Sequence, residues 1–195
     1  PYVHLQGWGE PFTHPEFFRF VAVARSAGCQ VGTTTNGLLL DLERCRQLVQ
    51  AGVDVVGLSL AGATAATNDH WRDGAPLDRV LGAIDRLAGC RREAGTDRPA
   101  IHIAYLLLGA HLDELEQLPA LLAGRGVDQV VISTLDCLPD PNLRAQALRP
   151  RTGDAHLALR ARLEAVAGRQ AGLAVHATLA APVDAITSRP RCVEN

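Results

Sequence analysis

The stretch Tyr2-Val3-His4-Leu5-Gln6-Gly7-Trp8-Gly9-Glu10-Pro11 decides the fold of this chain. Its first half reads as an apolar strand, and its second half is a turn with two glycines and a carboxylate before a proline. Glycine lets a backbone come close to a ligand. The proline holds Glu10 extended and directs its polar groups outward. The stretch therefore predicts a strand that ends in a ligand-binding turn.

Outward from this turn, short apolar runs alternate with longer amphipathic stretches. The predicted strands are Tyr2–Gln6, Gln30–Thr35, Val55–Leu60, Ala100–Leu107, Gln129–Thr134 and Leu173–Ala177. The predicted helices are Pro15–Ala27, Leu42–Ala51, Leu77–Ala94, Leu112–Arg125 and Asp154–Ala171. A βα repeat of this kind indicates a parallel sheet with right-handed crossovers. The nearly continuous apolar strands are typical of a sheet covered by helices on one face and lining a barrel on the other.

Local signals place some helix ends. Thr13 and Glu16 have the spacing of a capping box, and Pro15 falls in the expected first turn. Glycines follow four of the helical runs, where left-handed helix stops are common. These glycines are Gly28, Gly52, Gly126 and Gly172.

Composition narrows the class of protein. The chain has 195 residues, 47% of them hydrophobic, which suits one substantial domain. A net charge of −2 argues against a nucleic-acid binder, and all 19 basic residues are arginine. No run approaches the roughly 20 apolar residues needed to span a bilayer, so no membrane partner is expected.

The cysteines indicate a reducing compartment. They are Cys29, Cys45, Cys90, Cys137 and Cys192. Their odd number and scattered positions argue against a disulfide framework and favour the cytoplasm. As spaced here, they fit no local zinc or iron–sulfur signature.

Three predicted strand ends carry small, hydroxyl or amide residues. They are Gly7–Pro11, Thr33–Gly37 and Leu58–Gly62. Ligands in parallel βα folds gather at the carboxyl ends of the strands, so we expect these segments to share one rim. The rim offers acceptors for an ammonium and partners for a ribose or carboxylate. This suits a zwitterionic nucleoside such as S-adenosylmethionine (SAM) better than a bare phosphate.

These segments resemble the motifs of radical SAM enzymes. Gly7-Trp8-Gly9-Glu10-Pro11 resembles the family's Gly-Gly-Glu-Pro turn, and Thr34-Thr35-Asn36-Gly37 resembles its Thr-Thr-Asn-Gly. Leu58-Ser59-Leu60-Ala61-Gly62 resembles its Val-Ser-Leu-Asp-Gly, with Trp71-Arg72-Asp73-Gly74 matching a downstream helix that bears an Arg-Gly pair. The resemblance covers about residues 2 to 177. Ala61 departs from the frequent Asp, which leaves substrate chemistry unspecified.

The resemblance implies roles for individual residues. Gly9 and Glu10 would contact the methionyl ammonium of SAM, and Thr35 and Ser59 its ribose or carboxylate. Arg72 would pair with that carboxylate. The backbone of residues 106–108 would flank the adenine. Apart from the resemblance, Trp8 is interpreted as a packing anchor under the cofactor, without a catalytic role. The implied cofactor-binding residues are Gly7, Gly9, Glu10, Thr35, Asn36, Ser59 and Arg72. Gly7 is less secure, because either Gly7 or Trp8 can match the first glycine of the motif.

The resemblance also implies a cluster that this chain does not supply. Family members hold a [4Fe–4S] cluster with a C-x-x-x-C-x-x-C loop after their first strand. No such motif is present. The expected fold is therefore α/β, a partial (β/α)₆ TIM-like barrel of parallel strands with the first βα unit missing. The cluster ligands are expected upstream of Pro1, and this fragment alone is expected to be inactive.

The implied function is radical chemistry. The cluster would deliver an electron that cleaves SAM to methionine and a 5′-deoxyadenosyl radical, which abstracts a substrate hydrogen. Residues 1–181 would form the core. Residues 182–195 would be a linker toward a SPASM-like extension, with Cys192 a candidate ligand of an auxiliary [4Fe–4S] cluster. Such an extension favours peptide or protein modification, or cofactor maturation. Flavodoxin or ferredoxin is the expected electron donor.

Other interpretations remain open on the residues alone. The chain could be a degenerate, non-catalytic barrel that serves as a binding or scaffold module. A class I aldolase is ruled out, because its Schiff-base lysine has no counterpart here. Several candidate residues also have ordinary structural interpretations. These are Asn36-Gly37 as a turn, Ser59 as a cap and Arg72 as a surface residue. His102 is expected to point into the barrel, and both His4 and His102 are interpreted as satisfied core histidines, with a contact to substrate as the alternative. Cys29, Cys45 and Cys90 are expected to be buried small hydrophobes.

Overall fold

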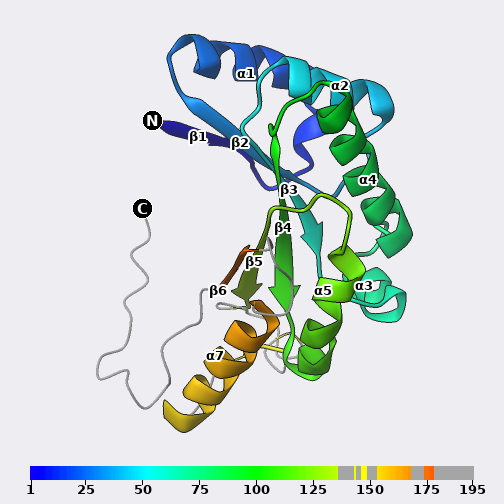
Figure 1. Ribbon diagram of the computed structural model, residues 1–195, viewed down its shortest axis with the longest axis vertical. Helices are drawn as coiled ribbons and strands as arrows, with labels where there is room; N and C mark the ends of the chain where they lie inside the picture. Colours follow the sequence, from blue (N-terminus) through cyan, green and yellow to red (C-terminus); the bar gives the residue numbers. More distant parts are fainter. Residues whose placement is uncertain (136–142, 144–145, 149–152, 168–173, 178–195) are drawn as a thin grey trace.

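The structure of this chain is a computed structural model, and it describes residues 1–135, 143, 146–148, 153–167 and 174–177. Cys137, Gly172 and the predicted linker 182–195 with Cys192 lie outside the described residues. Figure 1 shows one curved sheet with helices against its convex side.

The sheet has six parallel strands in the order of the sequence. They are β1 (Tyr2–Leu5), β2 (Gln30–Thr35), β3 (Val55–Leu60), β4 (Ala100–Leu107), β5 (Gln129–Thr134) and β6 (Ala174–Ala177). Because every strand pairs with its sequence neighbour, the carboxyl ends of β1, β2 and β3 meet at one rim. Thr35 at the end of β2 lies opposite Leu58 of β3. The predicted α/β fold with a parallel, barrel-like sheet is confirmed.

The helices agree with the sequence pattern in most places. They are α1 (Phe17–Ser26), α2 (Leu42–Gln50), α3 (Ala65–Trp71), α4 (Leu77–Glu93), α5 (Leu118–Leu122) and α7 (Gly153–Ala167), with 3₁₀ segments η1 (Pro11–Thr13) and η2 (Gly109–Gln117). The single helix predicted at Leu112–Arg125 is wrong. A 3₁₀ segment kinked at His111 occupies its first part, and Pro119, which lacks an N–H, lies in the first turn of α5. In the described part of the chain, no helix has the length and apolarity to cross a membrane.

The predicted capping box at Thr13 and Glu16 is also wrong. Helix α1 starts at Phe17, and the side chain of its N-cap residue Glu16 makes no cap hydrogen bond. The Thr13 hydroxyl instead donates to the carbonyl of Glu10 at 2.7 Å, which closes the turn after β1. The expected left-handed stops are confirmed at Gly28, Gly52 and Gly126, whose φ angles are 75°, 69° and 75°.

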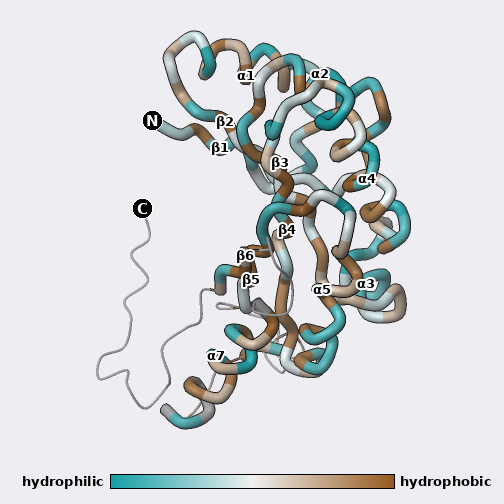
Figure 2. Tube along the Cα trace, viewed as in Figure 1, coloured by the Kyte–Doolittle hydropathy of each residue, from teal (hydrophilic) through white to brown (hydrophobic). Residues whose placement is uncertain are grey.

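The two faces of the sheet differ in burial. On β4, Ile101, Ile103, Tyr105 and Leu107 point toward the helices and are buried, while the alternate residues are only half-buried. Figure 2 shows the corresponding hydrophobic colouring along the central strands. The core therefore lies between sheet and helices, and the concave face stays accessible.

The three cysteines in the described residues differ in burial. Cys45 and Cys90 are buried free thiols, as expected, but Cys29 is only half-buried. Burial, with a smaller effect from Cys90, raises the pKa of Cys45 to about 12. Cys45 therefore stays protonated at neutral pH and acts as a packing residue.

The sequence Gly-Val-Asp occurs twice, at residues 52–54 and 126–128, and each aspartate connects the amino-terminal ends of two neighbouring strands. Asp54, just before β3, accepts a hydrogen bond from Val31 N at 2.8 Å and pairs with Arg25 and Arg98. Asp128, just before β5, accepts one from Ile101 N at 2.7 Å and pairs with Arg91. Each carboxylate thus holds the start of the preceding strand, at the end of the sheet away from the rim.

Asp54 tests the strength of this arrangement. We expect Asp54→Asn to lower the free energy of unfolding by about 2 kcal/mol, because hydrogen bonds to buried charges contribute roughly 1.5–3 kcal/mol. Denaturant titration measures this. The matched control is Asp85→Asn, which breaks an ion pair between Asp85 and Arg125. The Asp85 side chain is 50% exposed, so this variant should lower the free energy of unfolding by about 0.5 kcal/mol or less. Equal losses in the two variants would contradict this account.

Candidate functional site

The carboxylate of Glu10 joins the first two rim turns. One of its oxygens accepts a hydrogen bond from the Thr35 hydroxyl at 2.6 Å, and the other accepts one from Asn36 N at 2.9 Å. The first oxygen also lies 3.4 Å from Phe12 N. Thr35 is buried, so this contact is shielded from solvent. The turn after β1 is therefore fixed against the end of β2 by one ionisable side chain.

The turn after β2 is shaped by its own residues. The side-chain oxygen of Asn36 accepts a hydrogen bond from Leu38 N at 3.0 Å, and the Thr35 hydroxyl accepts one from Gly37 N at 3.0 Å. Gly37 has a φ of 81°, a conformation that favours glycine. The turn interpretation of Asn36-Gly37 is therefore confirmed. The backbone N–H of Asn36 still points at Glu10.

The turn after β3 is packed tightly against α3. A Cβ atom on Gly62 would lie 2.7 Å from both Asn68 N and the Thr67 Cβ, so only glycine allows this approach. Thr64 caps α3 by accepting a hydrogen bond from Thr67 N. Ser59 therefore does not cap this helix and remains half-buried at the rim.

Two side chains, one half-buried and one fully buried, hold α3 in place. Glu114, on η2, accepts hydrogen bonds from Ala63 N at 2.7 Å and Thr64 N at 3.2 Å, and it also bonds the Thr67 hydroxyl. Asn68, fully buried, accepts from Ala61 N at 3.2 Å and donates to Ala75 O at 3.0 Å. Sequence reasoning missed both residues, because neither belongs to a rim motif. Together they fix the position of the residue that ends α3.

That residue is Arg72, the C-cap of α3. Burial lowers the pKa of its guanidinium, and the nearby Glu10 carboxylate partly offsets this effect. Within the described residues, no side chain forms a hydrogen bond or ion pair with this guanidinium. Arg72 is thus a half-buried cation and not a surface residue, with unused donors at the rim.

A cavity of about 230 Å³ joins these groups. Its lining includes Gly9, Glu10, Thr35, Asn36, Ser59 and Arg72, six of the seven residues that the sequence indicated. Gly7 does not line it, and Trp8 is fully exposed, so Trp8 does not pack beneath this cavity. Gln6 and Thr34 line it as well. Gln6 directly follows β1 and Thr34 is the next-to-last residue of β2, so their positions at strand ends could have indicated them.

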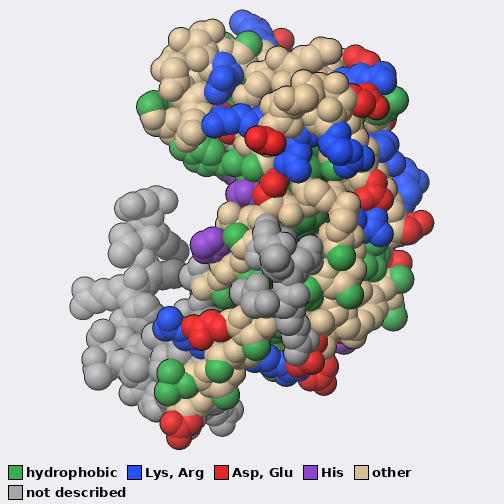
Figure 3. Space-filling model, viewed as in Figure 1, with side chains coloured by type: hydrophobic (Ala, Val, Ile, Leu, Met, Phe, Trp, Pro, Cys, Tyr) green, Lys and Arg blue, Asp and Glu red, His purple; other side chains and the backbone are tan. Residues whose placement is uncertain are grey.

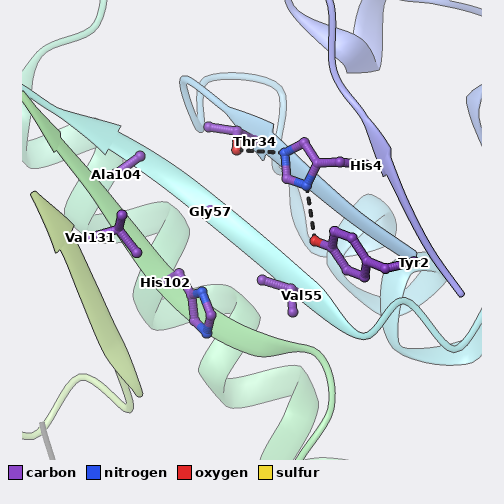
Figure 4. A pocket seen from close by; sticks show the side chains of 8 residues that line it. All are labelled: Tyr2, His4, Thr34, Val55, Gly57, His102, Ala104 and Val131. Atoms are coloured by element: carbon purple, nitrogen blue, oxygen red, sulfur yellow. Dashed lines mark hydrogen bonds between the residues drawn. The ribbon is translucent and has the colours of Figure 1, made fainter. Parts of the chain in front are cut away.

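A second cavity, of about 390 Å³, lies on the concave face of the sheet and is called the interior pocket below. Figure 4 shows its lining side chains: Tyr2, His4, Thr34, Val55, Gly57, His102, Ala104 and Val131. Figure 3 shows the hollowed side of the molecule with histidine side chains at its edge. His102 points into the barrel, as expected. His4 is exposed on this face and His102 is half-buried, so the prediction that both are buried core histidines is wrong. Their strands point them away from the helix-covered core.

Comparison with known proteins supports one family. A sequence model of the radical SAM superfamily matches residues 2–122, more than half of the chain. The chain is 31% identical over 137 residues to the tungsten-containing aldehyde ferredoxin oxidoreductase cofactor-modifying protein of Pyrococcus furiosus, covering 68% of this chain and 37% of that protein. It is 34% identical over 87 residues to the mycofactocin maturase MftC of Mycobacterium tuberculosis, covering 45% of this chain and 22% of that protein.

Solved structures agree on the fold. Streptococcus suis SuiB bound to S-adenosylmethionine superimposes with a TM-score of 0.70 at 14% identity, over 91% of this chain and 39% of that one. At this identity the likeness concerns the fold. The chain spans well under half the length of these relatives.

The Thr35 hydroxyl offers a direct test of the joined turns. We expect Thr35→Val to lower the free energy of unfolding by about 1–3 kcal/mol, because it leaves Gly37 N and one Glu10 oxygen without their buried partner. Thr35→Ser keeps the hydroxyl and should lose clearly less. Denaturant titration compares the two. Equal losses would mean that the hydrogen bonds of Thr35 do not hold these turns.

Proposed function

The chain belongs to the radical SAM superfamily, and from this premise we propose that the cavity at the ends of β1, β2 and β3 binds SAM. The full-length protein then uses SAM as a radical source. The observation that carries the proposal is Arg72, a half-buried guanidinium without a side-chain partner among the described residues, beside the Glu10 turn.

The charges of the cavity suit the methionyl end of SAM. Its ammonium needs acceptors, which the Glu10 turn supplies, and its carboxylate needs a cation, which Arg72 supplies. Gly9 lines the cavity, yet a Cβ atom there would meet nothing within 4 Å. The protein's own packing therefore does not require glycine at this position. A ligand that approaches the backbone closely would require it.

The neutral groups of the cavity suit the remaining polar atoms of SAM. Ser59 contributes a hydroxyl to its lining. Thr35 and Asn36 were expected to contact SAM directly, but their side chains are already hydrogen-bonded within the protein. The Thr35 hydroxyl is held by Glu10, and the Asn36 side chain by Leu38 N. In this proposal they shape the site chiefly by fixing its turns, and the backbone of residues 106–108 flanks the adenine.

The [4Fe–4S] cluster implied by the family does not fit the residues at hand. Within the described ranges, no group of three or more His, Cys, Asp or Glu side chains could hold a metal ion. We infer that three cysteines upstream of Pro1 hold the cluster. The cluster, held by such cysteines, would supply the electron for reductive cleavage of SAM to methionine and a 5′-deoxyadenosyl radical, which would take a hydrogen atom from the substrate. This chain alone would then be inactive.

The relatives suggest the broader role. Their names refer to the modification of a cofactor and to the maturation of mycofactocin. We propose that this protein acts in peptide modification or cofactor maturation, in the reducing cytoplasm, with flavodoxin or ferredoxin as electron donor. In the same proposal, residues 182–195 lead into a SPASM-like extension and Cys192 is an auxiliary-cluster ligand.

Anaerobic reconstitution of the full-length protein with iron and sulfide tests the activity. With dithionite and SAM, we expect 5′-deoxyadenosine and methionine in equal amounts, measured by chromatography and mass spectrometry. SAM binding without 5′-deoxyadenosine, and no visible iron–sulfur absorbance, would instead indicate a degenerate barrel that only binds.

Arg72 tests the site itself. We expect Arg72→Ala to weaken SAM binding about 10–100-fold, because charge-assisted hydrogen bonds contribute roughly 1.5–3 kcal/mol. Arg72→Lys should recover only part of the affinity, since it loses the forked geometry. Isothermal titration calorimetry measures this, with Arg79→Ala on the exposed side of α4 as control. Unchanged affinity in Arg72→Ala would remove Arg72 from the site.

A further inference from the structure

The described lining of the interior pocket contains no acidic residue and no arginine. Its volume, about 390 Å³, falls in the roughly 300–1,000 Å³ range of small-molecule sites. Val55 and Gly57 on β3 lie between the strands that carry His4 and His102, and Ala104 and Val131 add apolar lining on β4 and β5 (Figure 4).

His4 is held in one orientation by three neighbours. Its Nδ1 lies 2.9 Å from the Tyr2 hydroxyl, and its Nε2 lies 2.9 Å from the Gln6 side-chain oxygen and 3.1 Å from the Thr34 hydroxyl. Figure 4 shows Tyr2, His4 and Thr34 linked in this way along one side of the pocket. The imidazole is therefore a fixed polar edge in an otherwise apolar space.

Small residues create the depth of the pocket. A Cβ atom on Gly57 would lie 3.0 Å from the Thr34 hydroxyl, so the position of Thr34 depends on glycine there. On β4, His102 is the partner of Gly57 in register, and Ala104 lies two residues further along, opposite Ser59. Because Ala104 lines the pocket, a larger side chain at this position would fill part of its space.

The electrostatics of the pocket disfavour a charged occupant. Burial lowers the pKa of His102, and the neighbouring His176 acts in the same direction, while Asp128 opposes it. His102 is therefore mainly neutral at neutral pH. A charged ligand would lose its hydration without gaining an ion partner, which is costly.

The pocket adjoins the proposed cofactor site. Thr34 lines both cavities, and Gln6, a hydrogen-bond partner of His4, lines the cofactor cavity. A group bound in the interior pocket would therefore lie next to SAM.

We propose that the interior pocket selects an uncharged, mainly apolar substrate group, such as an aromatic or branched aliphatic side chain, and seats it between His4 and His102. This inference rests on the proposed function. His4 and Ala104 are its specificity-determining residues, the first by offering a fixed polar edge and the second by leaving space. Charged side chains of similar size are rejected.

Ligand titrations followed by NMR test the proposal. The full-length protein, reconstituted and labelled with ¹³C at histidine Cε1, is titrated at pH 7.5 with phenol, and separately with benzoate and benzylammonium as ring-matched anion and cation. Variants His4→Gln and His102→Gln assign the two resonances. We expect phenol to shift both, and the two ions to bind at least tenfold more weakly.

The matched variants are Ala104→Leu and Ala100→Leu. Both enlarge a residue on the same face of β4, but Ala100 does not line the pocket. We expect Ala104→Leu to weaken phenol binding at least tenfold and Ala100→Leu to change it less than twofold. Equal binding of phenol and benzoate, or phenol binding unaffected by Ala104→Leu, would overturn the proposal, as would unmoved His4 and His102 resonances.

SAM cleavage is measured in the same samples to separate the two proposals. If cleavage occurs but phenol does not bind, the pocket inference fails alone. If the unmodified protein neither binds SAM nor forms 5′-deoxyadenosine, the proposed function fails.

Discussion

The two-armed hydrogen bonding of Glu10 is the contact on which the candidate site depends. One carboxylate accepts from a buried hydroxyl and from a backbone N–H on the next strand's turn. This converts two adjacent but separate loops into one rigid rim. Charge-assisted hydrogen bonds to a carboxylate are strong where water is excluded. The same carboxylate faces Arg72, so it also sets the local charge of the cavity.

The third side of the cavity is built by a different device. Arg72 ends a short helix that could not hold its place by its own length. Glu114 binds the start of that helix from η2, and Asn68 ties it to the turns on both sides. The rim is therefore held in two ways. Glu10, which lines the cavity, fixes the first two turns, whereas Glu114 and Asn68, which do not line it, fix the helix that ends at Arg72. At the opposite end of the sheet, Asp54 and Asp128 fix the strand starts.

Much of this architecture was predictable because it follows local rules. The strands were indicated by apolar runs and confirmed almost residue by residue, and the rim turns by glycine, threonine and asparagine at strand ends. Six of seven indicated site residues line one cavity, because parallel strands in sequence order bring their carboxyl ends together.

The failures have long-range causes. Thr13 looked like a helix cap, but its hydroxyl is taken by the Glu10 carbonyl. His4 and His102 looked like core residues, but pattern alone does not say which face of a strand the helices cover. The support of α3 by Glu114 joins residues about fifty positions apart, which no local motif reports. Pairings of this kind depend on the folded sheet and could not be predicted from sequence periodicity.

An anaerobic crystal structure of the full-length, cluster-loaded protein with SAM tests the central claim most directly. The account predicts the methionyl group between the Glu10 turn and Arg72, with the Glu10 carboxylate still bound to Thr35 and to Asn36 N. SAM bound elsewhere, or a Glu10 carboxylate turned away from the end of β2 when SAM is present, would contradict it.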